Sequence, residues 1–393
     1  MPGFEVIGEE EKRAVMDIFD RSNGVLFYRG FDERRNHIFR VLDFEAAFAK
    51  RLGARHAQAV TSGTAALKVA LKALGIGPGD EVITQAFTFV ATVEAILDTG
   101  ATPIVVDVDD TLNMDPAALR AAITPRTKAV IPVHMMHAAA AMDDILAIAR
   151  EHNLFVVEDT AQACGATYHG KPLGTLGHLG CFSFDFGKTI TTGEGGMVVT
   201  DDEELFRRAR SYHNHGHAFL PGVPPGEEPG IMPGFNFRMT ELQAAVGLAQ
   251  LEKLDFILER QRANKARMKA YLEPEADALG IRFRRILNPE GEGGDTLVIF
   301  TGSRERARAV AKYMAQHGVG TKLLPGAERW HFAGYWEWIW RDHPLYAQDW
   351  ATRWAASAHW LEQAVALPVM VLDEPDAIER KMRVVREALR ATL

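Results

Sequence analysis

Between residues 55 and 200 the chain alternates short β-branched, apolar runs with stretches of helical periodicity. Parallel strands need long crossover connections, and the crossover helices then cover the sheet, so this alternation is typical of a mainly parallel sheet. It predicts an α/β fold. The expected strands, each bounded by turn residues, are 81–85, 103–107, 128–133, 154–158 and 197–200.

Helix signals fill the gaps between these strands. One predicted helix starts near Thr64 and ends at Gly75, and another opens with Asp115 and Pro116, a capping residue followed by proline at the first helical position. After Thr240 a long amphipathic stretch runs to residue 272 without a proline. This stretch is expected to bridge two parts of the molecule.

The length of 393 residues predicts two domains, because single cores stop growing at roughly 250 to 300 residues. Beyond the bridging stretch, the pattern predicts a strand at 296–301, a helix at 303–316 and a closing helix at 374–389. We therefore expect a large domain over 1–260, including an N-terminal segment, and a smaller α+β domain over 261–393.

Composition excludes several classes of protein. No apolar run approaches the ~20 residues that span a bilayer, and the first residues lack the basic and apolar regions of a secretory signal. A cytoplasmic protein without a membrane role is expected. A net charge of -8 without a basic cluster argues against nucleic acid as a partner, because phosphate contacts need Lys and Arg concentrated on one face.

Cysteine and histidine usage does not favour a metal site. Cys164 and Cys181 form no CxxC motif and have no cationic neighbours that would activate a thiol, so they are expected to pack as small apolar residues. His213, His215 and His217 alternate in a polar stretch, where histidines more often face solvent or an anion than a metal. No metal is expected.

Lys188 is the most distinctive candidate for chemistry. It stands between a probable strand and a glycine-rich turn, in a stretch with no other lysine or arginine. If it is partly buried, its charged form is disfavoured and its amine becomes available to form an imine with an aldehyde. The alternative is a lysine that extends to the surface without a catalytic role.

Other segments could complete a site around this lysine. Glu158 and Asp159 follow an apolar run at a strand end, where open α/β sheets bind ligands. An acid there could hold a cofactor ring nitrogen protonated, or Asp159 could simply cap a helix or form a salt bridge at the strand end. Residues 61–67 open a helix with small residues whose free N–H groups can bind phosphate, although such helix starts are common. Phe89 could pack in the core or stack on a flat ring.

Together these pieces closely resemble the DegT/DnrJ/EryC1/StrS family of sugar aminotransferases, within the fold type I enzymes that use pyridoxal 5′-phosphate (PLP). The resemblance is strongest from Thr61 to Leu251 and loose after about residue 275. It implies an aspartate aminotransferase-like, three-layer domain with a mainly parallel sheet and a smaller α+β C-terminal domain. The matching segments are SGTAAL, FTFVAT, VEDTAQACGA, CFSF, KTITTGEGGMVVT and GFNFRMTELQAAVGLAQL.

The resemblance also implies roles for individual residues. Lys188 would carry PLP as a Schiff base, Asp159 would pair with the pyridine nitrogen, and Gln162 would lie by the ring hydroxyl. Phe89 would cover the ring face.

Four further residues are implied to contact the phosphate group. Gly63, Thr64 and Ser183 would hold it within one subunit. Asn236 would reach the phosphate of the neighbouring subunit, which implies a homodimer with shared active sites.

The implied reaction is a ping-pong transfer. An amino acid, with glutamate expected, gives its amino group to the cofactor and leaves as a keto acid, and a keto sugar then takes up the nitrogen. Lys188 would move the proton between the substrate and cofactor carbons. Some relatives carry histidine at this position and dehydrate their sugar, so the lysine disfavours that alternative. Other PLP chemistry and a non-catalytic sugar-binding or regulatory protein are the remaining alternatives.

The segment from His134 to Ala138 lacks the aromatic and glycine that many members carry there, so local contacts near the cofactor's edge are expected to differ. Two other regions bear on the choice of sugar. The tract 29–36 and the tryptophan-rich region after Arg329 resemble a subgroup that aminates an eight-carbon sugar acid to give 8-amino-3,8-dideoxy-manno-octulosonate.

All seven tryptophans fall between residues 330 and 360. The simpler interpretation is that they pack an insertion against the large domain or a dimer partner. The sharper one is that some rings stack on the apolar face of a sugar while Arg329, His331 or Lys322 meets an acidic group on it. The predicted substrate-binding residues are Trp330, His331 and Arg329.

Overall fold

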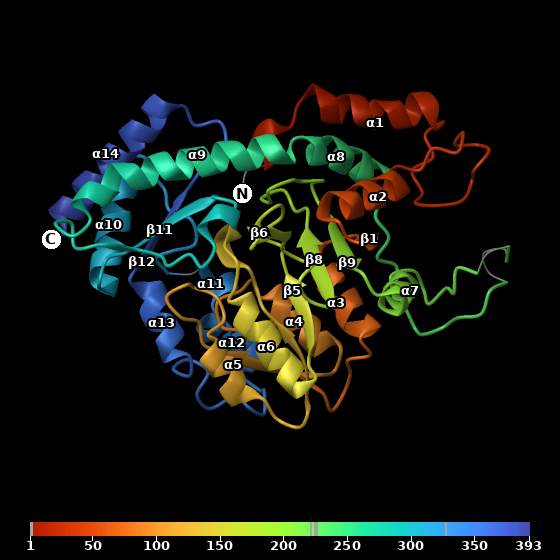
Figure 1. Cartoon of the computed structure of the whole chain (residues 1–393), viewed down its shortest axis with the longest axis horizontal. Helices are drawn as coiled ribbons and strands as arrows, with labels where there is room; N and C mark the ends of the chain where they lie inside the picture. The colour runs from red at the N-terminus through yellow and green to blue at the C-terminus, as the bar shows by residue number, and fades with distance from the viewer. Residues whose placement is uncertain (1–2, 221, 224–226, 327) are drawn as a thin grey trace.

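A computed structural model of the chain describes residues 3–220, 222–223, 227–326 and 328–393. Within these ranges seven strands form one sheet in the order β1–β9–β8–β5–β4–β2–β3 (Figure 1). Neighbours pair in parallel except around β9, which is antiparallel to both β1 and β8. The mainly parallel sheet confirms the α/β prediction. Its strands are β1 (His56–Val60), β2 (Glu81–Gln85), β3 (Thr102–Val106), β4 (Thr127–Ile131), β5 (Phe155–Asp159), β8 (Leu179–Ser183) and β9 (Gly196–Thr200).

Helices cover both faces of this sheet, as crossover connections require. Residues alternate between the faces: in β5, Val157 packs under the α3 side and Val156 under the α6 side. On one side lie α3 (Gly63–Ala73), α4 (Ala91–Asp98) and α7 (Glu203–Tyr212). On the other lie α2 (Arg40–Leu52), α5 (Pro116–Ala122), α6 (Met142–His152) and α8 (Glu241–Glu252), and α1 (Glu9–Arg21) packs on α8.

The helix starts follow the capping rules. The Ser62 side chain accepts a hydrogen bond of 3.1 Å from Ala65 N at the start of α3. The Asp115 side chain accepts one of 2.8 Å from Ala117 N, with Pro116 as the first helical residue, as expected. β1 is not among the expected strands, because its sequence HAQAV lacks the β-branched run that marks the others.

A second, three-stranded antiparallel sheet forms the smaller lobe, from β10 (Arg282–Phe283), β11 (Thr296–Phe300) and β12 (Ala364–Pro368). It packs with α9 (Leu254–Leu272), α10 (Arg304–Gln316) and α14 (Pro375–Ala391) around its own core. A boundary at residues 260 and 261 falls inside α9, which Figure 1 shows running along the upper side of this lobe. The exact division remains a prediction.

The stretch 240–272 is not one helix. It divides at Lys253 into α8 and α9, because the Lys253 N–H bonds to Gln250 O at 3.1 Å and tightens the turn. The Lys253 ammonium is held by the N-terminal segment, 2.7 Å from Val6 O and 2.8 Å from Glu11. These contacts fix the break between the two helices.

The tryptophan-rich segment covers the open edge of the large sheet. Trp336, Trp340 and Trp354 are buried in one cluster. Trp354 Nε1 donates to Val105 O at 2.9 Å, and the Tyr346 hydroxyl donates to Pro103 O at 3.0 Å, so the segment binds the edge strand β3 directly. For these three tryptophans the packing interpretation is correct, and the reason is the need to cover an unpaired edge.

In the described part of the chain, no helix is both long and apolar enough to cross a membrane.

Candidate active site

A cavity of about 450 Å³ lies where the parallel strands end. Its walls come from the carboxyl ends of β5 and β8, the first turn of α3, and the segment after β2. This is where open α/β sheets place their ligand crevices. The expected residues that line it are Gly63, Thr64, Phe89, Asp159, Gln162, Ser183, Lys188 and His331.

Lys188 lies on the loop between β8 and β9. Its backbone is fixed at both groups: its N–H donates to Asp185 O at 3.0 Å, and its carbonyl accepts from Gly3 N at 2.9 Å. Burial lowers the pKa of Lys188, although the carboxylates of Asp185 and Asp159 oppose the shift. The result is a larger share of neutral, nucleophilic amine than an exposed lysine has.

Asp159 is buried at the end of β5. Its Oδ2 accepts from the Thr92 hydroxyl at 2.8 Å, and its Oδ1 accepts from Ala161 N at 3.1 Å. Burial raises the pKa of Asp159, and these two hydrogen bonds oppose the rise. A cationic ring nitrogen in the cavity would give this buried carboxylate an opposite charge and favour its ionised form.

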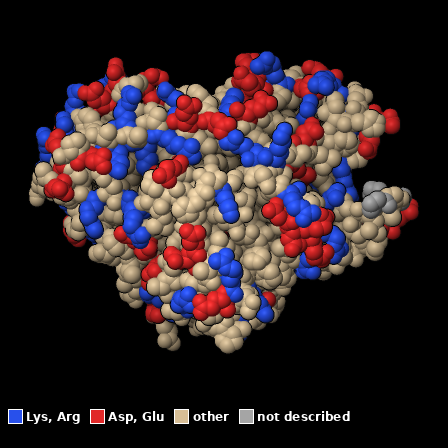
Figure 2. Space-filling model, viewed as in Figure 1, with Lys and Arg blue, Asp and Glu red and all other residues tan. Residues whose placement is uncertain are grey.

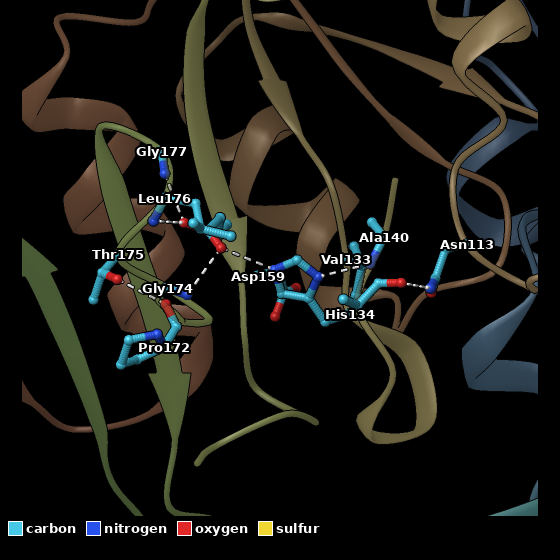
Figure 3. A network of polar contacts seen from close by, with 12 residues as sticks. Asn113, Val133, His134, Ala140, Asp159, Pro172, Gly174, Thr175, Leu176 and Gly177 are labelled. Carbon is cyan, nitrogen blue, oxygen red and sulfur yellow. Dashed lines mark hydrogen bonds and ion pairs between the residues drawn. The ribbon is translucent and has the colours of Figure 1, made fainter. Parts of the chain in front are cut away.

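Glu158, the neighbour of Asp159, is not part of the cavity lining, and its carboxylate lies in a closed network. Figure 3 shows four of the residues that bind it, namely His134, Gly174, Leu176 and Gly177. Its carboxylate accepts from Gly174 N at 2.8 Å, Leu176 N at 2.6 Å and Gly177 N at 2.7 Å. It also bonds to His134 Nε2 at 3.0 Å.

The His134 ring connects this carboxylate to the strand end beside the cavity. Ala140 N donates to Nδ1 at 3.1 Å, so Nε2 carries the proton that His134 shares with Glu158. The His134 N–H donates to Asp159 O at 3.1 Å. The network therefore holds the backbone of Asp159 in place. The sequence pattern assigned no site role to His134 or Glu158.

A cradle of free N–H groups lies at the N-terminus of α3. The N–H groups of Gly63 and Thr64 precede the first intrahelical bonds, and Ser183 Oγ lies beside them in the cavity lining. A Cβ built on Gly63 would meet Ser183 Cβ at 2.7 Å, so only glycine lets this helix approach β8 so closely. Free N–H groups at a helix N-terminus attract anions.

Gln162, Phe89 and His331 complete the walls. Gln162 Oε1 accepts from Met136 N at 3.1 Å, which orients the amide. Phe89 is 43% exposed, and its ring centroid lies 5.2 Å from that of His331. The His331 backbone carbonyl accepts from Thr88 N at 3.1 Å, which brings this distant segment to the cavity.

The His331 imidazole is electrically neutral near pH 7, because burial lowers its pKa to about 4 and the charges of Lys188 and Lys322 add to the shift. Its Nδ1 has no hydrogen-bond partner within the described residues. A neutral imidazole suits a hydroxyl better than it suits a carboxylate.

Three predicted site residues lie outside the lining that the described residues form. Asn236 is exposed, and its Oδ1 accepts from Arg238 N at 3.3 Å. Arg329 and Trp330 are exposed as well, and the Trp330 ring packs edge-on against Trp338 at 5.5 Å. Conversely, Thr92, Asp185 and Glu194 line the cavity without having been expected there.

His213, Cys164 and Cys181 lie in surroundings that bear on the predicted roles of histidine and cysteine. His213 does not face solvent: it is fully buried, and its ring packs edge-on against Tyr28. Burial raises the pKa of Cys164 to about 12 and that of Cys181 well above its ordinary value, so neither thiol is activated. Within the described ranges, no group of three His, Cys, Asp or Glu side chains is arranged to hold a metal.

Comparison with solved structures identifies the fold. The chain is similar to an aminotransferase from Psychrobacter cryohalolentis, with a TM-score of 0.87, 28% identity and 98% of each chain covered. It is also similar to NtdA from Bacillus subtilis with bound cofactor PMP, with a TM-score of 0.83, 26% identity, and 99% of this chain and 84% of that chain covered. The fold is the type I, aspartate aminotransferase-like fold expected from the sequence.

Comparison with curated proteins gives a relative of higher identity. The chain is 47% identical over 244 residues to GDP-perosamine synthase from Caulobacter vibrioides, which is 62% of this chain and 63% of that protein. The match thus spans less than two thirds of that relative. The family match is longer, covering residues 37–386. The chain belongs to the DegT/DnrJ/EryC1/StrS aminotransferase family.

Proposed function

We propose that this chain is a PLP-dependent aminotransferase that moves an amino group from an amino acid to a keto sugar. The observation that carries the proposal is that one cavity contains the Lys188 amine, the Asp159 carboxylate and the N-terminus of α3. An amine for an aldehyde, an acid for a ring nitrogen and free N–H groups for a phosphate are the three contacts that PLP requires.

The residues present fit PLP. Gly63, Thr64 and Ser183 would hold the phosphate, and Lys188 would hold the aldehyde carbon covalently. Asp159 would bind the ring nitrogen. When bound, PLP supplies an electron sink for the carbanion of the substrate.

Phe89 and Gln162 would bind the ring from its face and from its edge. Phe89 presents a flat, exposed ring to the cavity. The Gln162 amide is turned by Met136 N so that its NH₂ group remains free to donate toward the ring hydroxyl.

Lys188 would also move the proton during the reaction. Its Nζ can take a proton from the substrate carbon and return it, because burial keeps its pKa below that of an exposed lysine. His331 offers a neutral imidazole to a substrate hydroxyl.

The identities of donor and acceptor are also proposals. Glutamate is the expected donor, and a relative named L-glutamine:2-deoxy-scyllo-inosose aminotransferase makes glutamine a second candidate. For the acceptor, the name GDP-perosamine synthase favours a nucleotide-linked keto sugar. The tract 29–36 and the tryptophan-rich segment favour an 8-oxo octulosonic acid instead.

The test begins with the absorbance spectrum of the PLP-loaded protein before and after addition of L-glutamate or L-glutamine. We expect the cofactor band to shift with one of them and to return when a keto sugar is added. Borohydride should fix the cofactor to Lys188, as located by mass spectrometry, and Lys188→Ala should abolish the label. Replacement of the exposed Lys312 by alanine is the matched control. Labelling of another lysine in Lys188→Ala would contradict the assignment.

A further inference from the structure

A second cavity, of about 330 Å³, lies in the smaller lobe between α9 and the β10–β11 side of its sheet. Three cations enter it from α9, namely Arg262, Lys265 and Lys269, and a fourth, Arg284, follows β10. Glu292 is the acidic residue in the described lining. Figure 2 shows blue Lys and Arg side chains along α9, with red Asp and Glu side chains among them.

Arg284 is the buried end of this cavity. It is 6% exposed; its Nε donates to Thr111 O at 2.5 Å, and its Nη1 donates to Met135 O at 3.0 Å. Its Nη2 is buried and has no partner among the described residues. Burial lowers the pKa of Arg284 to about 10, so the group stays charged at neutral pH. A buried cationic group with an unpaired donor is costly, and an anion beside the part of Arg284 that lines the cavity would offset its charge.

The carboxylates nearby do not balance the positive charge. Lys265 pairs with Glu292, and Arg262 Nε donates to the Glu292 backbone carbonyl at 2.7 Å. Lys269 pairs at 3.4 Å with Glu273 on the same helix. Asp295 and Asp109 also act on Arg284, but they pair with Lys322 and Arg285. Among the described residues neither Arg262 nor Arg284 belongs to an ion pair, so the lining keeps an excess of positive charge.

The cavity also has an apolar side. Phe283, Leu297 and Val298 line it, and the Lys269 ammonium lies 5.4 Å from the centroid of the Phe283 ring. Few converging polar groups on an apolar wall are typical of a site for a small organic molecule.

We propose that this cavity binds a small dianion, a phosphate or a dicarboxylate, held between the Arg284 guanidinium and the ammonium groups of α9. The ligand would contact Arg284, whose Nη1 donates to Met135 O. The next residue, Met136, donates its N–H to Gln162 in the active site. The site is separate from the aminotransferase cavity, and its existence does not depend on the reaction proposed for that cavity.

Isothermal titration calorimetry on the PLP-loaded protein tests this, because PLP fills the phosphate cradle of α3 and leaves the second cavity as the expected anion site. The two probes are inorganic phosphate and succinate, each at low ionic strength. Lys269→Gln removes one ammonium at a partly exposed position and should weaken binding about tenfold, the scale of one charge-assisted hydrogen bond. Lys312→Gln on α10 removes the same charge at an exposed position outside the cavity and should bind like the unmodified protein.

Arg284→Met should abolish binding of both probes. If the Arg284→Met protein does not fold, the affinity of Lys269→Gln tests the proposal by itself. Preference for phosphate would assign a phosphate-bearing ligand, and preference for succinate a dicarboxylate. The proposal is wrong if neither probe binds in the millimolar range. It is equally wrong if Lys269→Gln binds as tightly as Lys312→Gln.

Discussion

The Thr92 hydroxyl donates a hydrogen bond of 2.8 Å to Oδ2 of Asp159. Thr92 comes from α4, after β2, and Asp159 ends β5, so the bond joins two separate walls of the active-site cavity. With Oδ1 bound to Ala161 N, the carboxylate is fixed in one orientation before any ligand arrives. Such preorganisation is expected of a group that must meet a ring nitrogen.

Asp159→Asn should therefore keep the fold and bind PLP while losing most of the transamination rate, by about a hundredfold or more, since a neutral amide cannot stabilise a protonated ring nitrogen. Thr92→Val should lose less, because the Ala161 N–H remains. Single-turnover rates with glutamate, beside a circular dichroism spectrum, measure both. Near-normal turnover in Asp159→Asn would assign ring protonation to another group.

Gly63→Ala should weaken PLP binding about tenfold or more, because its Cβ would meet Ser183 Cβ at 2.7 Å and displace the cradle. Alanine has a higher helix propensity than glycine, so the substitution does not weaken α3, and weaker PLP binding would not result from loss of the helix. Gly77→Ala is the control, since its nearest neighbour is Thr99 O at 4.0 Å. Equilibrium dialysis of PLP compares the two, and equal affinities would remove Gly63 from the phosphate site.

His331→Ala should slow the sugar half-reaction while leaving the glutamate half-reaction and thermal stability nearly unchanged. Trp336→Ala should instead lower stability by roughly 3 to 5 kcal/mol and damage both halves, because its indole is fully buried. Trp330→Ala, at an exposed position, tests direct contact with the sugar. Single-turnover kinetics beside melting curves separate these outcomes, and equal damage to both halves in His331→Ala would refute its sugar contact.

Stability should fall as the pH drops from about 6.5 to about 4. Burial lowers the pKa of His137 to about 4 in the folded state, whereas the unfolded chain takes up this proton near its ordinary value of about 6.5. Protonation therefore favours the unfolded state within that window. His137→Gln should reduce the difference between urea midpoints at neutral and mildly acidic pH, and replacement of the exposed His152 should not. An unchanged difference in His137→Gln would exclude this residue as the cause.

Mixing two inactive variants tests the shared site of the proposed homodimer. If Asn236 serves the neighbouring subunit, a Lys188→Ala chain paired with an Asn236→Ala chain forms one intact site and one doubly defective site. Random pairing should then restore about a quarter of the normal activity. If activity does not recover although sedimentation of tagged subunits shows that the chains have exchanged, Asn236 acts only within its own chain.

Much of this site could be predicted because its signals are local. A strand end, a helix start and a lone lysine each stand out in sequence, and parallel topology brings them to the same edge. His134 and Glu158 could not be recognised in this way, because nothing in an apolar run says which of two adjacent acids faces the cavity. The cations of α9 were hidden for a similar reason, since charges on an amphipathic helix ordinarily face solvent.

Two fold details depended on distant contacts. The break at Lys253 arises where an N-terminal segment holds its ammonium, more than two hundred residues away in sequence. The tryptophan-rich segment became interpretable only once β3 proved to be a sheet edge that needed covering. Helical periodicity and composition carry neither fact.

The opposite directions of Glu158 and Asp159 restrict how this protein can vary over evolution. Successive side chains of a strand alternate between its faces, so a single-residue deletion within β5 ahead of the acids would turn the aspartate toward the network and move the glutamate to the position of Val157, in the core under α3. Substitutions elsewhere in β5 exchange only apolar volume, whereas such a deletion removes the acid from the cavity. Length variation among descendants of this chain should therefore gather in the surface loops and spare the residues from Phe155 to Asp159.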